Sequence, residues 1–580
     1  MKELLLGNEA IARGLYEVGC KIISSYPGTP STEITEAAAK YKEIYSEWAV
    51  NEKVAAEVAI GASFAGARAC CAMKHVGLNV AADPLYTASY TGVNAGLVFV
   101  AADDPGMHSS QNEQDTRNHA IGAKVPVLEP SDSRECLDYI KLAFEISEEY
   151  DTPVILRLST RVSHSRSIVT LSKREELENK KYIKNPEKYV MMPAMAKKRR
   201  VFIEERQKKL LELCEKGSFN SARMGDRKIG VITSGISYEY VKEALGDRAS
   251  ILKLGMTNPL PVDLIKNFAQ KTDKLYVVEE LDDIIESHCK KHAIEVTGKE
   301  IFPRYGELSQ NIIKQAILGE KSEGVTSPFS DLPPRPPVLC PGCPHRALFY
   351  TLGKEKVFVS GDIGCYTLGA LAPLNGMDTC VCMGASIGAL HGYNKANEER
   401  TGSKSVAIIG DSTFIHSGIT GLINIAYNKG TSKVIIADNS ITGMTGHQQN
   451  PTSGYTLAGD PTATVDLEAL AKAVGIKNVS VIDPNNLSES RKVIRQELNK
   501  DEPSVIISRR PCALLKYVKH EPAIVPNIEK CNGCGLCMQI GCPAISINEG
   551  KVRINETLCV GCGVCTQLCK RAVLTQEIKE

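Results

Sequence analysis

The sequence lacks any apolar run long enough to cross a membrane, and no signal-peptide core follows Met1. We therefore expect a soluble, cytoplasmic protein. A formal net charge of only +1 argues against nucleic-acid binding, which needs a local excess of Lys and Arg. No G-x-G-x-x-G of the Rossmann type follows an expected strand, which disfavours an NAD-linked reaction. No low-complexity tract is present, so an ordinary globular protein is expected.

Cysteine, in contrast, is abundant, with 20 residues in a chain of 580. A chain of this length is expected to form several domains. In an intracellular protein, regularly spaced cysteines indicate metal binding more often than disulfides. The positions of the cysteines therefore carry information about function.

The stretch 404–451 organises the rest of the chain. It predicts a buried strand at 405–409, a turn at Gly410-Asp411-Ser412, and a helix that ends at Lys429. A second apolar strand at 434–437 follows. Two short strands joined by a helix form a βαβ unit with parallel strands, and ligands of such sheets lie beyond the carboxyl ends of the strands.

Asp411 and Asn439 fall at these two carboxyl ends. A carboxylate and an amide oxygen are ligands that Mg²⁺ accepts when substrate phosphates complete its octahedron, and nearby glycines let backbone N–H groups approach a diphosphate. An ordinary turn between parallel strands is the alternative. The stretch resembles the thiamine-diphosphate signature, although Ser412 and Ser440 stand at its variable places. That resemblance implies Mg²⁺ ligands at Asp411, Asn439 and the Ile441 carbonyl, and cofactor contacts at Gly410, Asp411, Ser412, Asn439, Ile441, Thr442, Gly443 and Thr445.

The last 60 residues contain an internal duplication of cysteine motifs. Cys531-x2-Cys534-x2-Cys537-x4-Cys542 is followed by Cys559-x2-Cys562-x2-Cys565-x3-Cys569. In two-cluster ferredoxins, which this tail resembles, three cysteines of one run and the last cysteine of the other hold each cubane. We therefore expect two [4Fe-4S] clusters, with a zinc ribbon as the alternative. The first cluster is expected on Cys531, Cys534, Cys537 and Cys569. The second is expected on Cys559, Cys562, Cys565 and Cys542.

Further cysteines lie near the thiamine-type stretch, in Cys340-Pro341-Gly342-Cys343 and in Asp362-Ile363-Gly364-Cys365. Together with the other motifs they make the chain similar to the 2-oxoacid:ferredoxin oxidoreductases. The resemblance implies a third [4Fe-4S] cluster near thiamine diphosphate, held by Cys340, Cys343, Cys365 and Cys512, and further cofactor contacts at Gly364 and Gly384. Packed, redox-silent thiols are the alternative. Cys380 and Cys382 are expected to line the diphosphate site.

The N-terminal region supports the same resemblance. Tyr26-Pro27-Gly28-Thr29-Pro30-Ser31 looks like the substrate loop of the family, with Thr29 as a catalytic candidate. Glu52 matches the glutamate that contacts the thiamine aminopyrimidine, with Glu57 as the second choice. A solvated helix carboxylate is the alternative for either residue. In the pyruvate enzymes an arginine after the strand equivalent to 97–101 receives the substrate carboxylate, whereas this sequence reads Ala102-Asp103-Asp104.

The expected fold class is α/β, with several doubly wound parallel-sheet domains of the thiamine-diphosphate type and a small two-cluster ferredoxin-like α+β domain. The expected segments are a pyrimidine-binding domain (1–166), a charged helical connector that we expect to be solvated (167–222), a transketolase-C-like α/β domain (223–325), a Pro-rich linker (326–337), a domain for the diphosphate and Mg²⁺ (338–517) and the ferredoxin-like tail (520–580).

This order of segments is most similar to the α subunits of the indolepyruvate-type members of the family. The resemblance implies oxidative decarboxylation of aryl 2-oxoacids, such as indolepyruvate and phenylpyruvate, to aryl-acetyl-CoA and CO2, with thiamine diphosphate, Mg²⁺ and coenzyme A. It implies a smaller β subunit and a soluble ferredoxin as electron acceptor. The alternatives are the same chemistry on pyruvate or branched-chain acids, a non-oxidative decarboxylase with structural clusters, and an electron-transfer module without its own chemistry.

Overall fold

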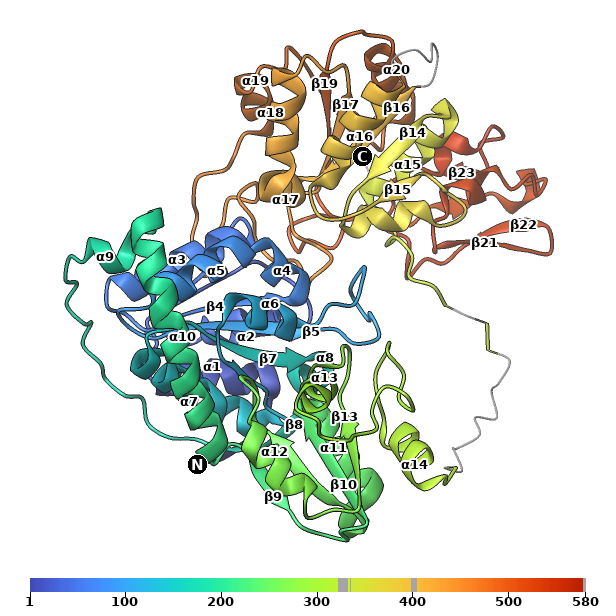
Figure 1. Cartoon of the computed structure of the whole chain (residues 1–580). Helices are drawn as coiled ribbons and strands as arrows, with labels where there is room; N and C mark the ends of the chain where they lie inside the picture. Colours follow the sequence, from blue (N-terminus) through green and yellow to red (C-terminus); the bar gives the residue numbers. More distant parts are fainter. Residues whose placement is uncertain (322–331, 334, 398–403, 577–580) are drawn as a thin grey trace. The chain divides into compact units, whose positions relative to one another are not determined.

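The computed structural model of the chain describes residues 1–321, 332–333, 335–397 and 404–576 (Figure 1). The chain forms two compact units, Met1–Pro328 and Phe329–Glu580. The finer division into six segments stays a prediction. Most of the predicted linker 326–337 lies outside the described residues, and its described residues belong to neither helix nor strand.

The first unit is built on a seven-stranded sheet in the order β12-β6-β7-β5-β4-β2-β3. All its neighbouring strands run parallel except β12, which pairs antiparallel with β6. The strands are β2 (Ile22–Ser25), β3 (Tyr45–Trp48), β4 (Ala69–Lys74), β5 (Leu97–Asp103), β6 (Val127–Leu128), β7 (Val154–Ser159) and β12 (Met256–Asn258).

Helices cover both faces of this sheet because its central strands are apolar on both sides. On β5, Val98 and Val100 face a core with α1 (Gly7–Glu17) and α7 (Ser133–Tyr150), whereas Phe99 faces a second core with α3 (Glu52–Phe64) and α5 (Ala82–Thr91). This doubly wound arrangement is the one predicted. The remaining helices are α2 (Thr32–Ala38), α4 (His75–Val80), α6 (Thr116–Ala123) and α8 (Thr160–His164), and β1 (Lys2–Leu6) pairs antiparallel with β8 (Arg166–Thr170).

The charged connector contains α9 (Pro186–Tyr189) and α10 (Pro193–Lys216). The prediction of a helix is correct, but the expectation of a solvated helix is wrong for one face of α10. Ile203, Arg206 and Leu210 are buried there, and the Arg206 guanidinium donates to the backbone carbonyls of Ser89 (3.0 Å) and Asp151 (2.7 Å). Long charged side chains can cover apolar surface, which is why composition alone misjudged this helix.

A four-stranded sheet completes the first unit, in the order β13-β10-β11-β9, with β9 antiparallel and the others parallel. The chain leaves this sheet briefly to add β12 to the edge of the larger one. The elements are β9 (Ser221–Arg223), β10 (Ile229–Ser234), β11 (Ser250–Leu254), β13 (Lys274–Val278), α11 (Gly235–Leu245), α12 (Val262–Ala269), α13 (Ile284–Lys291) and α14 (Gln310–Leu318).

The second unit contains a six-stranded parallel sheet in the order β15-β14-β16-β17-β19-β18. Separate apolar cores fill its two faces. The elements are α15 (Pro344–Glu355), β14 (Phe358–Gly361), β15 (Thr379–Cys380), α16 (Ala385–Ala396), β16 (Ser405–Gly410), β17 (Lys433–Asp438), α19 (Leu467–Ala473), β18 (Asn478–Ile482), α20 (Leu487–Leu498) and β19 (Ser504–Arg509).

The helix predicted after β16 is present, but it is not α-helical throughout. A short helix, α17 (Asp411–Thr413), passes through a π-helical turn at Phe414–Gly418 into α18 (Ile419–Tyr427). Such π-helical turns inside helices often occur at functional sites. The π-helical turn begins three residues after the predicted ligand Asp411. Sequence periodicity cannot distinguish such a turn from a regular α-helix.

The tail forms two small antiparallel ribbons around an apolar core that contains Cys565 and has six further motif cysteines packed against it. β20 (Val525–Pro526) pairs with β23 (Leu574–Thr575), and β21 (Ile545–Asn548) pairs with β22 (Lys551–Ile554). Gly533 and Gly561 occupy equivalent places of the two motifs in left-handed conformations, with φ of 71° and 64°. A Cβ on either would lie 2.4 Å from a backbone oxygen, of Gly550 or of Pro522.

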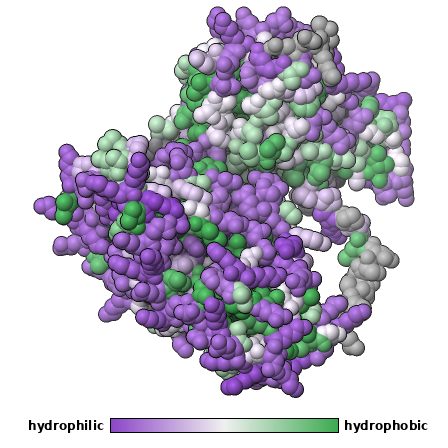
Figure 2. Space-filling view, in the orientation of Figure 1, coloured by the Kyte–Doolittle hydropathy of each residue, from purple (hydrophilic) through white to green (hydrophobic). Residues whose placement is uncertain are grey.

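Among the described residues, no helix is both long and apolar enough to cross a membrane. The face of the first unit that is visible in Figure 2 is mainly hydrophilic.

Candidate cofactor and cluster sites

Asp411 and Asn439 lie at the same edge of the second sheet. β16 and β17 are parallel neighbours with Gly410 opposite Ala437, so each polar residue follows the carboxyl end of its strand. Asp411 is 2% exposed and Asn439 is 7% exposed. Burial, and then the negative charge of Asp438, raises the pKa of Asp411 to about 7. A bound cation would stabilise the carboxylate form of Asp411.

A loop that sequence reasoning did not assign holds this edge in place. The Thr452 hydroxyl donates to Asp411 Oδ2 (2.9 Å). Asn450 Nδ2 donates to Thr442 Oγ1 (3.3 Å), and Thr442 Oγ1 donates to Ser412 Oγ (3.0 Å). The predicted cofactor contacts Ser412 and Thr442 are therefore in direct contact. Asn450-Pro451-Thr452 has the composition of a turn, and that was the only signal available in the sequence.

Asn439 also contacts His345, Ile441 and the predicted cluster ligand Cys512. Its Nδ2 lies 3.4 Å from Nε2 of His345, and its Oδ1 accepts a bond from the Ile441 backbone N–H (3.4 Å). Its carbonyl accepts from the Cys512 N–H (3.0 Å). Burial lowers the pKa of His345 to about 4, so its imidazole is neutral at physiological pH. Thr445, in the same glycine loop, donates through Oγ1 to Gln448 Oε1 (2.5 Å).

Asp362 is a functional candidate that sequence reasoning treated only as part of a motif. It is completely buried, its Oδ1 accepts from the N–H of Gly384 (2.8 Å), and its Oδ2 accepts from the N–H of Ser386 (2.9 Å). It thereby fixes the first turn of α16. Gly384 has φ of 83°, and a Cβ there would lie 2.1 Å from Ser417 Oγ. Gly364 is similarly crowded, against the ring of Tyr366.

The four upstream cysteines, Cys340, Cys343, Cys365 and Cys512, interact with one another, and Cys365 lies beside the glycine loop around Gly443. Burial, followed by the thiols of Cys512 and Cys340, raises the pKa of Cys365 to about 11. Burial also raises the pKa of Cys343 to about 12, with smaller contributions from Cys365 and Cys340. A Cβ on Gly443 would lie 3.4 Å from Cys365 Sγ. Cys380 and Cys382 are exposed, and their expected contact with the diphosphate remains a prediction.

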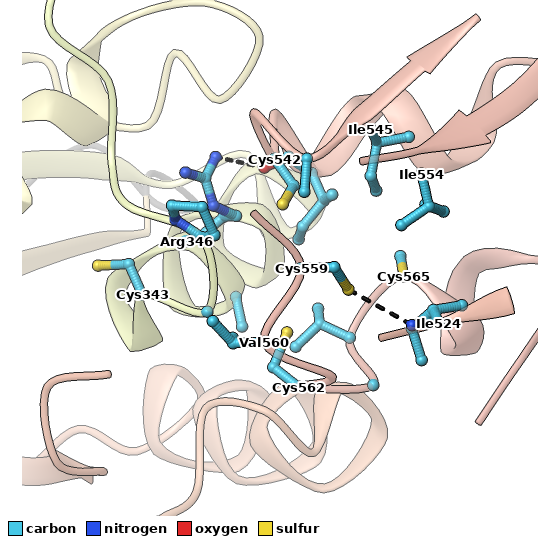
Figure 3. Close-up of a pocket in the computed structure, with 17 residues that line it drawn as sticks. Cys343, Arg346, Ile524, Cys542, Ile545, Ile554, Cys559, Val560, Cys562 and Cys565 are labelled. Carbon is cyan, nitrogen blue, oxygen red and sulfur yellow. Dashed lines mark hydrogen bonds between the residues drawn. The ribbon is translucent and has the colours of Figure 1, made fainter. Parts of the chain in front are cut away.

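The eight cysteines of the tail line two separate cavities. Cys531, Cys534, Cys537 and Cys569 line one of about 160 Å³. Cys542, Cys559, Cys562 and Cys565 line the other, of about 30 Å³, which is drawn in Figure 3. Each cavity thus collects three cysteines of one motif and the last cysteine of the other. This is the crossed grouping that the duplication predicts.

Backbone N–H groups point at several of these sulfurs. Val552 donates to Cys531 Sγ (3.5 Å) and Val573 to Cys569 Sγ (3.3 Å), while Ile524 donates to Cys559 Sγ (3.5 Å). Hydrogen bonds from Gly533 and Val552 lower the pKa of Cys531, which favours its thiolate. Such hydrogen bonds are one means by which a protein tunes an iron–sulfur cluster.

Within the described ranges, no group of three or more His, Cys, Asp or Glu side chains is arranged to hold a metal ion. In the tail, four motif cysteines line each of the two cavities.

In the first unit, Glu52 is the first residue of α3 and is only 4% exposed. Asn51 caps the helix by accepting from the Val54 N–H (2.9 Å). A Cβ on Gly77 would lie 2.7 Å from Glu52 Oε1, so the carboxylate packs closely against α4. Glu57, the second choice, is exposed and forms an ion pair with Lys53.

The loop that carries Thr29 follows β2 and lies next to the end of β4. The Thr29 carbonyl accepts from Ser109 Oγ (3.0 Å), while the Ser109 carbonyl accepts from Lys74 Nζ (2.9 Å). Asp103 is bound to Arg157 (2.6 Å), and Asp104 accepts from the Ser109 N–H (2.8 Å). The two acidic residues at the end of β5 therefore have partners of their own.

Comparison with known proteins agrees with this geometry. Residues 13–213 match the family described as pyruvate flavodoxin/ferredoxin oxidoreductase, thiamine diP-bdg, and residues 362–508 match thiamine pyrophosphate enzyme, C-terminal TPP binding domain. The chain is 42% identical to the indolepyruvate oxidoreductase subunit IorA of Archaeoglobus fulgidus, over 98% of this chain and 96% of that protein. The chain belongs to the IorA family.

The IorA protein of Pyrococcus horikoshii is 43% identical, over 94% of this chain and 92% of its own length. A solved 2-oxoglutarate:ferredoxin oxidoreductase from Magnetococcus marinus is similar with a TM-score of 0.46 and 17% identity, over 55% of this chain and 65% of that one. As an IorA family member, the chain is an enzyme of the 2-oxoacid:ferredoxin oxidoreductase class and contains thiamine-diphosphate-binding domains. The predicted family, fold class and enzyme class are confirmed.

Proposed function

We propose that this chain catalyses the coenzyme A-dependent oxidative decarboxylation of aryl 2-oxoacids, of the indolepyruvate and phenylpyruvate type, to aryl-acetyl-CoA and CO2. The observation that carries the proposal is the crossed grouping of eight cysteines around two cavities in a chain that also has thiamine-binding domains. Iron–sulfur clusters transfer electrons one at a time, so they suit a reaction whose electrons pass to a ferredoxin and not to a hydride carrier.

Thiamine diphosphate, when bound, supplies a nucleophilic carbon and an electron sink that no side chain offers. Asp411, Asn439 and the Ile441 carbonyl would hold the Mg²⁺ that anchors its diphosphate. Support comes from the burial of Asp411 and Asn439 at one edge of the sheet. Backbone N–H groups of the glycine loop around Gly443 would approach the phosphate oxygens.

Glu52 would hold a proton on the aminopyrimidine ring, and its burial in the first turn of α3 suits a carboxylate that must stay close to a ring nitrogen. Thr29 would face the substrate from the loop after β2. Both roles follow from the family resemblance, and the packing of Glu52 against Gly77 together with the surface position of Glu57 supports the choice of Glu52.

Three [4Fe-4S] clusters would carry the electrons. Two belong to the tail cavities, and the third to Cys340, Cys343, Cys365 and Cys512. Burial, followed by smaller contributions from neighbouring thiols of this set, raises the pKa of Cys343, Cys365 and Cys512. We further propose a smaller β subunit, because the relatives are named as subunits, and a soluble ferredoxin as acceptor. The aryl substrate is inferred from the names of the same relatives and from the acidic Ala102-Asp103-Asp104 segment, where pyruvate enzymes have an arginine.

An anaerobic assay of the chain with its β subunit tests the proposal by following ferredoxin reduction. Indolepyruvate, phenylpyruvate, pyruvate and a branched-chain 2-oxoacid are supplied in turn, with and without coenzyme A. Reduction by the aryl acids that depends on coenzyme A is the expected result. Reduction by pyruvate or the branched-chain acid alone would overturn the substrate, and aldehyde release without ferredoxin reduction would overturn the oxidative reaction.

A further inference from the structure

Arg346 lies where the cofactor domain meets the cysteine tail, within the second unit. It belongs to the first turn of α15, three residues after Cys343, and its side chain is 5% exposed. Figure 3 shows its guanidinium directed toward the tail segment that carries Cys542. Together with Cys343 and all four cysteines of the smaller tail cavity, Arg346 lines that cavity.

The hydrogen bonds of Arg346 all go to backbone carbonyls. Nη1 donates to Ile540 (3.1 Å) and Gly541, and Nη2 donates to Cys340 (3.2 Å) and Leu339. One guanidinium therefore joins the loop of the upstream cysteines to the loop of Cys542. Its Nε is buried and has no hydrogen-bond partner.

Within the part of the chain that the structure describes, no carboxylate forms an ion pair with Arg346. Arginine stays charged in proteins, and a buried charge without a counter-ion is costly. The position of Arg346 adds to this cost, since the first turn of a helix carries partial positive charge and disfavours a cation. The groups whose negative charge would offset the burial are thiols, those of Cys542, Cys343, Cys562 and Cys340.

We propose that Arg346 is a positioning residue and the shared counter-ion of two neighbouring clusters, the one near thiamine diphosphate and the one in the smaller tail cavity. This inference rests on the proposed function, because it needs both clusters. A cubane with four thiolate ligands has net negative charge and would therefore be the counter-ion that Arg346 lacks among the carboxylates. The packing is close enough for a shared role, because a Cβ on Gly342 would lie 2.3 Å from Cγ2 of Val560, which follows Cys559.

The step that Arg346 would assist is a one-electron transfer in which no bond forms or breaks. One electron would pass from a cluster held by the Cys340 set to a cluster held by Cys542, Cys559, Cys562 and Cys565. Each reduced cluster gains one negative charge, so a nearby fixed cation favours reduction and raises the reduction potential. The hydrogen bonds that Arg346 donates to backbone carbonyls of both loops would also keep the two sets of cysteines at a constant separation.

Potentiometric titration of the anaerobic full-length protein, followed by EPR, tests this role, with iron content measured on each sample. The variants are Arg346→Met, which removes the charge, and Arg346→Lys, which keeps it. Arg553→Met removes a charge from the exposed face of β22 in the same tail and serves as the matched control. We expect Arg346→Met to disfavour reduction of at least one cluster about tenfold, which is about 59 mV for a one-electron couple. Arg346→Lys and Arg553→Met should titrate as the wild type does.

Unchanged potentials in an Arg346→Met protein with full iron content would overturn the inference. Loss of iron from both Arg346 variants would also overturn it, since Arg346 would then serve folding and not cluster electrostatics. If only Arg346→Met loses iron, the reduction potentials of Arg346→Lys decide. Potentials equal to those of the wild type support the charge requirement, and shifted potentials contradict it. Absence of iron from the wild-type protein would instead refute the clusters of the proposed function, so the two failures are distinguishable.

Discussion

Replacement of Asp362 by asparagine tests whether this buried carboxylate holds the cofactor edge together. The side chain accepts three backbone N–H bonds, from Ile363 (2.9 Å), Gly384 (2.8 Å) and Ser386 (2.9 Å). An amide can keep the two bonds on one oxygen, but its NH2 group then faces the Ser386 donor. The variant therefore loses one charge-assisted bond and leaves one buried N–H group unsatisfied.

Each of those two effects costs about 1–3 kcal/mol. Part of the cost is offset, because burial raises the pKa of Asp362 and the amide carries no charge to bury. We expect a net loss of about 2–3 kcal/mol in the free energy of unfolding. For a unit of this size, each kcal/mol lowers the melting temperature by about 2–4 °C, so the second unit should melt about 4–12 °C earlier.

Thermal unfolding followed by circular dichroism measures this shift, and calorimetric titration with thiamine diphosphate and Mg²⁺ measures the accompanying loss of affinity. Asp466→Asn is the matched control. Asp466 accepts the N–H groups of Glu468 (2.9 Å) and Ala469 (3.1 Å) at the exposed start of α19, where asparagine caps equally well. If Asp362→Asn melts and binds as Asp466→Asn does, the reasoning about this edge is wrong.

Three further predictions concern the proposed sites. Glu52→Gln should retain thiamine diphosphate and iron yet lose at least about 100-fold in ferredoxin reduction; a rate within twofold of wild type would exclude the proton-holding role. Asn439→Ala should raise the Mg²⁺ concentration needed for half-maximal thiamine diphosphate binding by at least about tenfold, and unchanged Mg²⁺ dependence would remove Asn439 from the ligand set. Cys569→Ser should change the same EPR signal as Cys537→Ser, whereas Cys565→Ser should change another; pairing by motif, with Cys569 joining Cys565, would contradict the crossed grouping.

The sequence predicted the parts of the fold that depend on local pattern. Apolar runs such as 405–409 and 434–437 are too short for helices and too apolar for exposed strands, so their parallel pairing in a βαβ unit was predictable. Asp411 and Asn439 then had to reach the same edge. The crossed grouping of the tail cysteines was predictable for a similar reason, because the spacing of cysteines along the chain determines which of them can come together in the fold.

Features that depend on distant contacts could not be predicted. The role of Asp362 comes from N–H groups more than 20 residues away, at Gly384 and Ser386. The buried face of α10 depends on carbonyls near Ser89 and Asp151. The π-helical turn at Phe414–Gly418 has no composition signal, since its residues would also fit a regular helix. Burial of Arg346 without a carboxylate is likewise visible only in three dimensions.

The most direct test of the account adds indolepyruvate and coenzyme A to the anaerobic complex of the chain and its β subunit without ferredoxin, followed by rapid freezing and EPR. Electrons from the substrate then have only the clusters of the complex to enter. The account predicts signals of reduced [4Fe-4S] clusters that require the substrate and disappear when ferredoxin is added. Clusters that stay oxidised while CO2 and aldehyde accumulate would contradict it and assign the chain a non-oxidative decarboxylation.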